Sequence, residues 1–256
     1  MAISVDTVYQ KVLVFANKEQ RGYITPQEFN LFADQAQMEI FEQYFYDKNQ
    51  FGRVPGNNYA YSDMVTNLEE KIQLFERYDR EADVTYVSNN PSGHDSWGDV
   101  NLTTQFPNLY RLGVVRVDYE TEPHYRVAEE IQLNELTKYG TSPLGDWTKT
   151  RPVYTRYSGA NHKNLKVYPY PSSDKTIDRV LITYIQKPSK PNWGYVVVND
   201  KPLYNSNTST DFELHPAEES ELVYKILAFS GIAIEKPQLT QVAAGLEQVK
   251  VQQEKQ

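Results

Sequence analysis

The first third of the chain carries apolar residues at helical spacing. Ser4 is a suitable N-cap, and Ile3 before it is placed to pack against Val8. We therefore predict a first helix that ends before Gly22, a stop or turn residue. It should bury one stripe of side chains, formed by Val5, Val8, Val12 and Phe15.

A second helix has a stronger start signal. Thr25-Pro26-Gln27-Glu28 is a capping box with proline at the first helical position, and Ile24 and Phe29 flank it as a hydrophobic staple. The helix should run to about Lys48 and bury a stripe made of Phe29, Ala33, Ala36 and Ile40. Its opposite face is also apolar, so we expect this helix to be covered on more than one side; the residues there are Leu31, Met38 and Phe45. A third helix is predicted from about Ser62, with apolar positions at Val65, Leu68, Ile72 and Phe75.

From about Val84 to Tyr204 the pattern changes to β-branched and aromatic runs separated by turn clusters. The predicted strands are residues 112–119, 152–157, 165–168 and 179–185, and residues 158–164 form a hairpin loop. A short helix at Gln132 to Lys138 should interrupt the sheet. Long polar loops are expected at residues 88–98, 140–151 and 186–194. Strands at this spacing indicate a small antiparallel sheet or barrel.

The C-terminal part returns to a helical pattern. His215-Pro216 is a capped start with acidic residues in the first turn, and Gly231 should end this helix. Its apolar stripe is Leu222, Ile226 and Phe229. A last helix is predicted from Pro237, with a narrow apolar seam formed by Leu239, Val242, Leu246 and Val249. We expect this seam to dock on a neighbouring subunit or the portal; packing back on its own domain is the alternative.

The elements together predict an α+β fold with N-terminal helices, a central mostly antiparallel β-sheet or small barrel, and C-terminal helices. The expected parts are an N-terminal helical part at 1–80, a β-rich part at 81–210 and C-terminal helices at 211–256. We expect them to form one compact domain from which the last helix projects.

Composition narrows the function classes. The formal net charge is −8, which argues against a basic surface that holds nucleic acid. Cysteine is absent, so disulfides and thiol chemistry are excluded. The start of the chain lacks the pattern of a signal peptide and no apolar run is long enough for a membrane span, so we expect a protein made in a cytoplasm without membrane partners. Tyrosine occurs 20 times, which suits half-buried sheets and interfaces about equally.

The segment from Asn17 to Phe29 resembles the second half of a calcium-binding EF-hand loop. Gly22, Ile24 and Glu28 match its sixth, eighth and twelfth positions. However, the fifth position is Arg21, a fixed cation where a calcium ligand belongs. The same residues are explained by a helix cap, so we predict no calcium site.

Other catalytic signatures are missing from the sequence. The four histidines are His94, His124, His162 and His215, and none has the spacing of a metal-binding pair. Nucleophile-elbow, phosphate-loop, dinucleotide and zinc-protease motifs are all absent. We expect no enzyme activity, no cofactor and no metal, although a carboxylate pair formed only by the fold is left open.

Several strings resemble one family. Arg151-Pro-Val-Tyr-Thr-Arg-Tyr157, Leu165-Lys-Val-Tyr168-Pro169 and Val180-Leu-Ile-Thr-Tyr184 are similar to the β part of head–tail connector or ring (adaptor) proteins of tailed bacteriophages, as in short-tailed and crAss-like phages. The run from Phe212 to Leu227 is similar to the C-terminal helical entry of that group, and Gly22 to Phe29 to its opening. These are packing and turn residues, so the resemblance carries no catalytic or cofactor residue.

The resemblance implies a structural virion protein of the phage neck. Such a subunit forms a ring with copies of itself, typically twelve-fold, and joins the portal protein to the tail and neck proteins. Genomic DNA would pass through the ring as a non-specific neighbour. The protein would be located in the virion after assembly in the bacterial host cytoplasm.

Two other classes of function stay open at this point. One is another tail, baseplate or receptor-binding virion protein, which long aromatic loops at a sheet tip would favour. The other is a hydrolase with a carboxylate site formed by the fold. Position in the neck or tail, copy number and immediate neighbours are not encoded in any motif of the sequence.

Overall fold

A computed structural model of the chain describes most of its residues. The described residues are 3–17, 24–51, 64–88, 96–119, 124–141, 145–159, 162–170, 177–233, 245, 246 and 249. They form two compact units: residues 1–74 with 188–256, here called the helical unit, and residues 75–187, the β unit. The predicted boundaries at 80/81 and 210/211 differ from this division, because the N-terminal and C-terminal helices share one unit and residues 188–210 belong with them.

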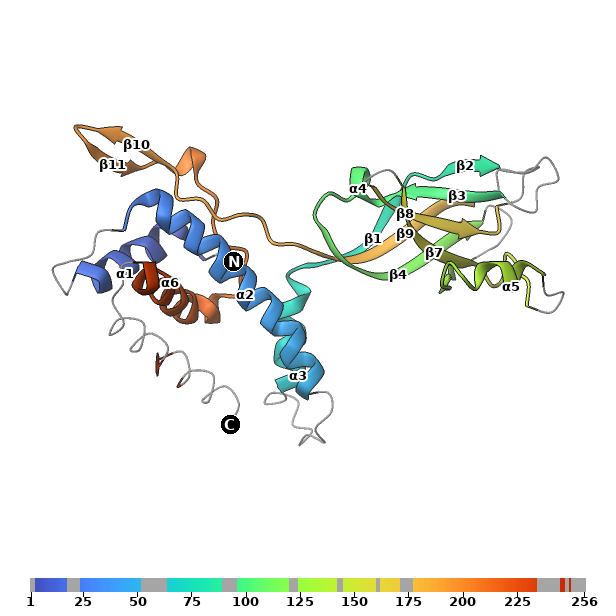
Figure 1. Cartoon of the computed structure of the whole chain (residues 1–256), viewed down its shortest axis with the longest axis horizontal. Coiled ribbons are helices and arrows are strands. Elements are labelled where there is room, and N and C mark those ends of the chain that lie inside the picture. The colour runs from blue at the N-terminus through green and yellow to red at the C-terminus, as the bar shows by residue number, and fades with distance from the viewer. Residues whose placement is uncertain are drawn as a thin grey trace. The chain divides into compact units, whose positions relative to one another are not determined.

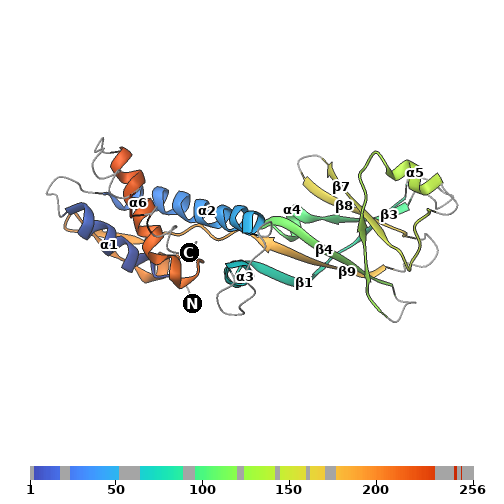
Figure 2. The same cartoon turned by 90° about the horizontal axis from the view of Figure 1, so that it is seen from below.

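The helical unit is built around α2. Its helices are α1 (Val5–Asn17), α2 (Pro26–Phe51), α3 (Met64–Gln73) and α6 (Glu219–Ala233), with short turns η1 (Ser206–Thr208) and η2 (Pro216–Glu218). Helix α6 packs against both α1 and α2, and α3 packs against α2 (Figures 1 and 2). The unit also contains a two-stranded hairpin, β10 (Tyr195–Val198) and β11 (Lys201–Tyr204).

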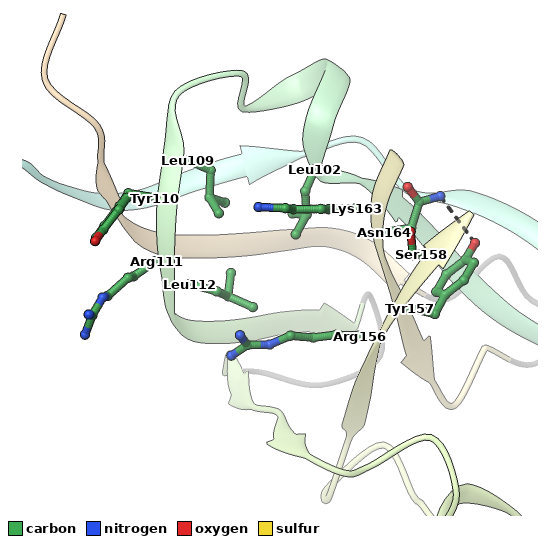
Figure 3. A pocket seen from close by; sticks show the side chains of 10 residues that line it. All are labelled: Leu102, Leu109, Tyr110, Arg111, Leu112, Arg156, Tyr157, Ser158, Lys163 and Asn164. Carbon is green, nitrogen blue, oxygen red and sulfur yellow. Dashed lines mark hydrogen bonds between the residues drawn. The ribbon is translucent and has the colours of Figure 1, made fainter. Parts of the chain in front are cut away.

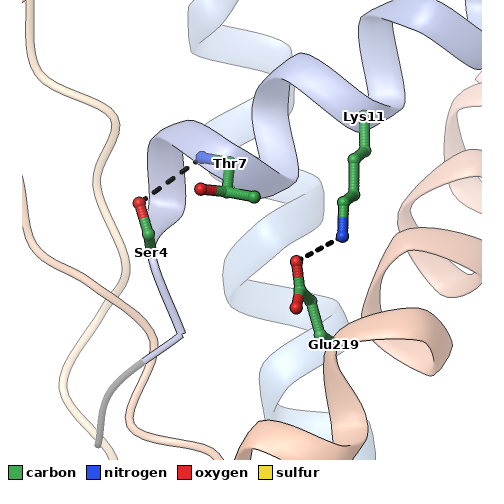
Figure 4. Close-up of polar contacts among 4 residues, drawn as sticks. All are labelled: Ser4, Thr7, Lys11 and Glu219. Carbon is green, nitrogen blue, oxygen red and sulfur yellow. Dashed lines mark hydrogen bonds and ion pairs between the residues drawn. The ribbon is translucent and has the colours of Figure 1, made fainter.

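Helix α1 starts as predicted and buries the predicted stripe except at its last position. The Ser4 hydroxyl accepts a hydrogen bond from the Thr7 amide at 3.4 Å, and the Lys11 ammonium pairs with Glu219 of α6 at 2.6 Å (Figure 4). Val5, Val8 and Val12 are fully buried. The prediction for Phe15 is wrong: its side chain is 44% exposed, and Ala16 is buried instead. At 100° per residue Phe15 and Ala16 flank the valine stripe on opposite sides at nearly equal angles, so packing against the rest of the unit decides which of them is buried.

Helix α2 confirms the capping box and one of its two predicted faces. The Glu28 carboxylate accepts hydrogen bonds from the Thr25 amide at 2.9 Å and the Thr25 hydroxyl at 2.7 Å. The predicted stripe is buried throughout: Phe29, Ala33, Ala36 and Ile40. The opposite face is not covered as predicted, because Leu31 is 73% exposed and Met38 and Phe45 are only partly buried.

The third predicted helix and the helix after His215 are confirmed in most of their features, whereas the last one, from Pro237, lies mostly outside the described residues. Leu68, Ile72 and Phe75 are buried; Ser62, the expected start of α3, lies outside the described residues. His215 caps the next turn, since its Nδ1 accepts from the Ala217 amide at 3.2 Å. Gly231 does not end α6, which continues to Ala233. A glycine costs about 1 kcal/mol inside a helix, and burial of the adjacent Ser230 shows that packing continues through this turn.

The β unit contains two sheets. The first has the order β1 (Glu76–Ala82), β9 (Ile177–Gln186), β4 (Leu109–Tyr119), β5 (Arg126–Val127). The second has the order β2 (Thr85–Ser88), β3 (Ser96–Asn101), β8 (His162–Tyr168), β7 (Val153–Gly159), β6 (Glu129–Glu130). All pairings are antiparallel except β6 with β7. The two short helices are α4 (Leu102–Gln105) and α5 (Leu136–Thr141), the latter placed later in the chain than predicted.

The α+β class is thus confirmed, and the four predicted strands correspond to β4, β7, β8 and β9. The alternative of a small barrel is wrong, because the two sheets do not close on each other. The chain instead passes from one sheet to the other four times: between β1 and β2, β3 and β4, β5 and β6, and β8 and β9. Figure 2 shows β4 and β9 in one layer and β7 and β8 in the other.

The core of the β unit lies between the two sheets. Its central side chains come from alternate positions of β4, β9 and β8, which is the period expected for strands with one buried face: Val115, Val117, Tyr119, Val180, Ile182, Leu165 and Val167. Tyr119 is the largest of the fully buried residues. Burial raises the pKa of its phenol.

Both neighbours of β9 are irregular at the same place. The register of β1 shifts between Arg77 and Arg80, and that of β4 shifts between Leu112 and Val115, in each case opposite Thr183. A Cβ added at Gly113 would lie 2.8 Å from the Thr183 carbonyl oxygen, so this bulge requires glycine. The bulge separates the core positions of β4 from residues 109–112.

Candidate functional site

A pocket opens at one end of the β unit. It has a volume of about 560 Å³ and is lined by residues of α4, β4, β7 and β8: Leu102, Leu109, Tyr110, Arg111, Leu112, Arg156, Tyr157, Ser158, Lys163 and Asn164 (Figure 3). We call it the sandwich pocket. Its size falls within the range of about 300–1,000 Å³ that is usual for binding sites.

The lining of the sandwich pocket is cationic. It contains Arg111, Arg156 and Lys163 and no acidic residue. Figure 3 shows the Lys163 and Arg156 side chains extending from β8 and β7 toward Leu109 and Leu112 of β4, while Arg111 points away from them. Arg156 pairs with Glu130 at 2.8 Å, but both side chains are about half exposed (51% and 46%), so this ion pair holds the arginine weakly.

Strand alternation explains why these charges face the opposite sheet. Tyr154 on β7 and Leu165 on β8 belong to the core between the sheets. Arg156 is two residues after Tyr154, and Lys163 two residues before Leu165, so both cations continue the inward face of their strands. The face therefore changes from apolar core to charged lining within one repeat of the pleat.

A polar network fixes the neighbouring wall of the pocket. The Tyr157 hydroxyl donates to Asp99 at 2.6 Å, and the Asn164 side-chain amide donates to the same carboxylate at 3.2 Å. Burial and the hydrogen bond to Asp99 raise the pKa of Tyr157, so its phenol stays protonated. Lys166 lies 4.0 Å from the ring centre of Trp97 and 4.8 Å from that of Tyr157, which adds cation–π contacts.

A second unusual surface is the β10–β11 hairpin. Its exposed side chains are mostly apolar: Val196 (50%), Val197 (60%), Val198 (46%), Leu203 (54%) and Tyr204 (41%). Within the described residues no third strand pairs with either edge. An isolated two-stranded hairpin is marginally stable in water, and free apolar strand edges tend to associate.

The base of the hairpin is anchored to the helical unit. Trp193 contacts Tyr9 of α1 at a ring distance of 4.4 Å and stacks on Tyr195, and its indole N–H donates to Asp6 at 2.9 Å. Gly194 packs so closely on Thr208 that an added Cβ would lie 2.8 Å from its carbonyl carbon. The hairpin is thus held firmly at its base while its strands remain exposed.

The predicted terminal seam is described only in part. Leu239 and Val242 lie outside the described residues. Leu246 and Val249 are helical and exposed, at 42% and 51%. Docking of this seam on a partner therefore stays a prediction.

Sequence reasoning missed the hairpin and the pocket. The hairpin had a signal: a valine run followed by Asn199-Asp200, the two residues that adopt positive φ (49° and 60°) in its turn. The pocket had a weaker one, because Arg156 and Lys163 occupy positions at which strand alternation predicts apolar residues. The position of β4 opposite Arg156 and Lys163 could not be predicted from the spacing of residues along the sequence.

Metal and membrane sites are not found in the part of the chain that the structure describes. No group of three or more His, Asp or Glu side chains there is arranged to hold a metal ion. Glu28, the last position of the EF-hand-like segment, is committed to the helix cap, and its hydrogen bonds from Thr25 lower its pKa. Residues 18–23 and His94 lie outside the described residues.

Among the described helices, none combines the length and apolar character of a membrane span.

Comparisons with known proteins add no relative. No protein-family model matches the chain. No curated protein matches it either. The sandwich pocket and the hairpin are therefore judged on their own geometry.

Proposed function

We propose that this chain is a structural virion protein that forms a ring in the neck of a tailed bacteriophage and joins the portal to the tail around the DNA channel. The β10–β11 hairpin carries the assembly part of this proposal. It exposes five large apolar side chains on two strands whose outer edges are unpaired within the described residues. A surface of this kind is typical of a protein that is completed by another chain.

The ring and the phage neck rest on the sequence resemblance in residues 151–168, 180–184 and 212–227. The fold is compatible with a binding role because both unusual surfaces, the hairpin and the sandwich pocket, are suited to holding another molecule. The residues that distinguish these two surfaces are hydrophobic or cationic side chains.

The hairpin can be tested with a substitution that preserves its pairing. Val196 and Leu203 are direct cross-strand partners, so Val196→Glu with Leu203→Lys replaces an apolar pair by an opposite-charge pair. We expect the double variant to melt like the wild type but to be absent from assembled particles. The matched control, Val127→Glu with Leu133→Lys, alters two exposed apolar residues of the β unit and should be incorporated normally.

Copy number and position in the particle test the function itself. Electron microscopy of particles containing a tagged chain should show multiple copies arranged as a ring next to the portal. A chain located at the tail tip, or present in a number incompatible with the symmetry of the portal, would refute the ring proposal. Normal incorporation of the hairpin variant would show that the apolar side chains of the hairpin are not needed for assembly, and would refute the assembly part of the proposal.

A further inference from the structure

The acidic excess of the chain is unevenly distributed. The β unit, residues 75–187, contains 14 Lys and Arg against 15 Asp and Glu, whereas the rest of the chain contains 12 against 19. The net charge of −8 therefore belongs almost entirely to the helical unit. The sandwich pocket, with three cations and no acid in its lining, is in the other unit.

Helix α2 is the most acidic element of the helical unit. It contains Glu28, Asp34, Glu39, Glu42 and Asp47 against Lys48 alone. Part of this acidity lies on an exposed line of side chains along the helix, here called the α2 stripe: Leu31, Gln35, Glu39, Glu42 and Tyr46. At 100° per residue these five positions fall within an arc of roughly 80°.

The α2 stripe combines acid with exposed apolar surface. Leu31 is 73% exposed and Tyr46 is 62% exposed, at the two ends of the stripe. Glu42 is exposed between them, and none of the described cations lies within ion-pair distance of it. The sequence led us to expect that this face of α2 is covered, and within one copy of the chain Leu31 is not.

The sandwich pocket offers the complementary chemistry. Leu102, Leu109 and Leu112 provide an apolar floor. Lys163 and Arg156 extend across it from two strands (Figure 3). No described acid lies within ion-pair distance of the Lys163 ammonium, and the Arg156–Glu130 pair is half exposed. A helix that brings a leucine or tyrosine next to a glutamate would satisfy both the leucines and the cations.

We propose that the sandwich pocket of one copy receives the α2 stripe of a second copy of this chain. The proposal rests on the proposed function, because a ring of identical subunits requires two unlike surfaces, one meeting the other around the circle. A pocket in the β unit and a stripe in the helical unit are such a pair. The contact would bury Tyr46 in the pocket and place Glu42, about one turn before it on the same face of α2, near Arg156 and Lys163.

A charge exchange tests the pairing. In the pocket variant Arg156→Glu is combined with Lys163→Glu; in the stripe variant Gln35→Lys is combined with Glu42→Lys. Glu39 is left unchanged because its carboxylate lies 3.9 Å from the buried Lys225 ammonium. Each variant alone should lose self-association, measured as co-purification of two differently tagged copies, by on the order of tenfold or more. Mixing the two variants, or combining all four substitutions in one chain, should restore it.

The control variant carries the same change of charge outside the pocket. Arg151 pairs with Glu129 at 3.0 Å, with both side chains 54% exposed, much as Arg156 pairs with Glu130. Arg151→Glu with Lys149→Glu should leave association unchanged. Circular dichroism of every variant checks that its fold is intact.

Disulfide trapping locates the contact. Because the chain has no cysteine, Ser158→Cys at the pocket and Tyr46→Cys on the stripe introduce the only thiols. When the two single variants are produced together and oxidised, we expect a mixed disulfide dimer. A dimer formed by Ser158→Cys alone, or no mixed product in an assembly that still forms, would overturn the proposal.

The outcomes separate this inference from the proposed function. A chain present as a ring in particles, with normal incorporation of the pocket variant, refutes the pocket–stripe contact and leaves the ring intact. A chain present in single copy refutes both. Binding of duplex DNA by the wild type that the pocket variant loses would assign the sandwich pocket to phosphate groups, and would likewise overturn the proposal.

Discussion

Trp193 offers the sharpest test of how the hairpin is held. Its side chain is only 4% exposed, and its described contacts all lie in the helical unit. Ring distances are 4.4 Å to Tyr9, 5.9 Å to Tyr195 and 5.8 Å to Tyr204. Trp193→Ala removes these contacts and leaves a cavity, so we expect the free energy of unfolding to fall by about 3–5 kcal/mol.

Trp193→Phe separates the ring contacts from the hydrogen bond. Phenylalanine keeps most of the aromatic packing but cannot donate to the Asp6 carboxylate, which now accepts at 2.9 Å. Asp6 is partly exposed, so water replaces part of what is lost. We expect a loss of about 1–2 kcal/mol, between the wild type and Trp193→Ala.

The assay can follow the two units separately. The other two tryptophans, Trp97 and Trp147, both lie in the β unit. In the Trp193 variants, indole fluorescence therefore reports on the β unit, while far-ultraviolet circular dichroism is dominated by the helices. Denaturant titration should show an earlier helical transition and an unchanged fluorescence transition. A helical transition shifted by less than about 1 kcal/mol in Trp193→Ala would refute the anchoring role.

Two further predictions follow from the described side chains. Millimolar calcium should leave the melting temperature unchanged, because the Glu28 carboxylate is used by the helix cap. A ligand raises the melting temperature only if the native state binds it. A calcium-dependent rise that Glu28→Gln abolishes would contradict this prediction. Above about pH 10 the β unit should lose stability, since burial raises the pKa values of Tyr119, Tyr154 and Tyr170, and the native state keeps phenol protons that the unfolded chain releases. Tyr119→Phe should reduce the fall by up to about 1.4 kcal/mol per pH unit, read from fluorescence titrations; an unchanged slope would show that Tyr119 ionises normally.

The sequence was sufficient to predict those features that depend on residues within a single helix or strand. The capping box at Thr25 and the His215 cap are set by side chains within three residues of the helix start, and both form. The strands β4, β7, β8 and β9 carry their core side chains at alternate positions, and their pairing is fixed by this buried face. Phe15 shows the limit of this reasoning, since two faces of α1 are apolar and only tertiary packing selects between them.

The candidate sites depended on information that is not local. The sandwich pocket needs β4 opposite β7 and β8, and these strands are separated by the segment that contains β5, β6 and α5. Division into two sheets rather than a barrel follows from where the chain changes sheet, at β1–β2, β3–β4, β5–β6 and β8–β9, and no motif in the sequence marks these four connections as sheet crossings. The helical unit unites residues from both ends of the chain, which no boundary drawn along the sequence can express.

The unusual surfaces of this protein are places where otherwise consistent patterns are broken. Leu31 is apolar on an exposed helix face, Val196 and Val198 are apolar and exposed on a two-stranded hairpin, and Lys163 is charged on the inward face of a sheet. Stability of the isolated chain gains little from any of them, since exposed apolar groups and cations at the mouth of a sheet sandwich do not add to a core. Lys163 and Arg156 are charged residues on an inward face, whereas Leu31 is an apolar residue on an outward face. The α2 stripe also carries Glu42, so the stripe and the pocket supply opposite charges to each other, which is why a second copy of the chain is a good candidate to cover the α2 stripe.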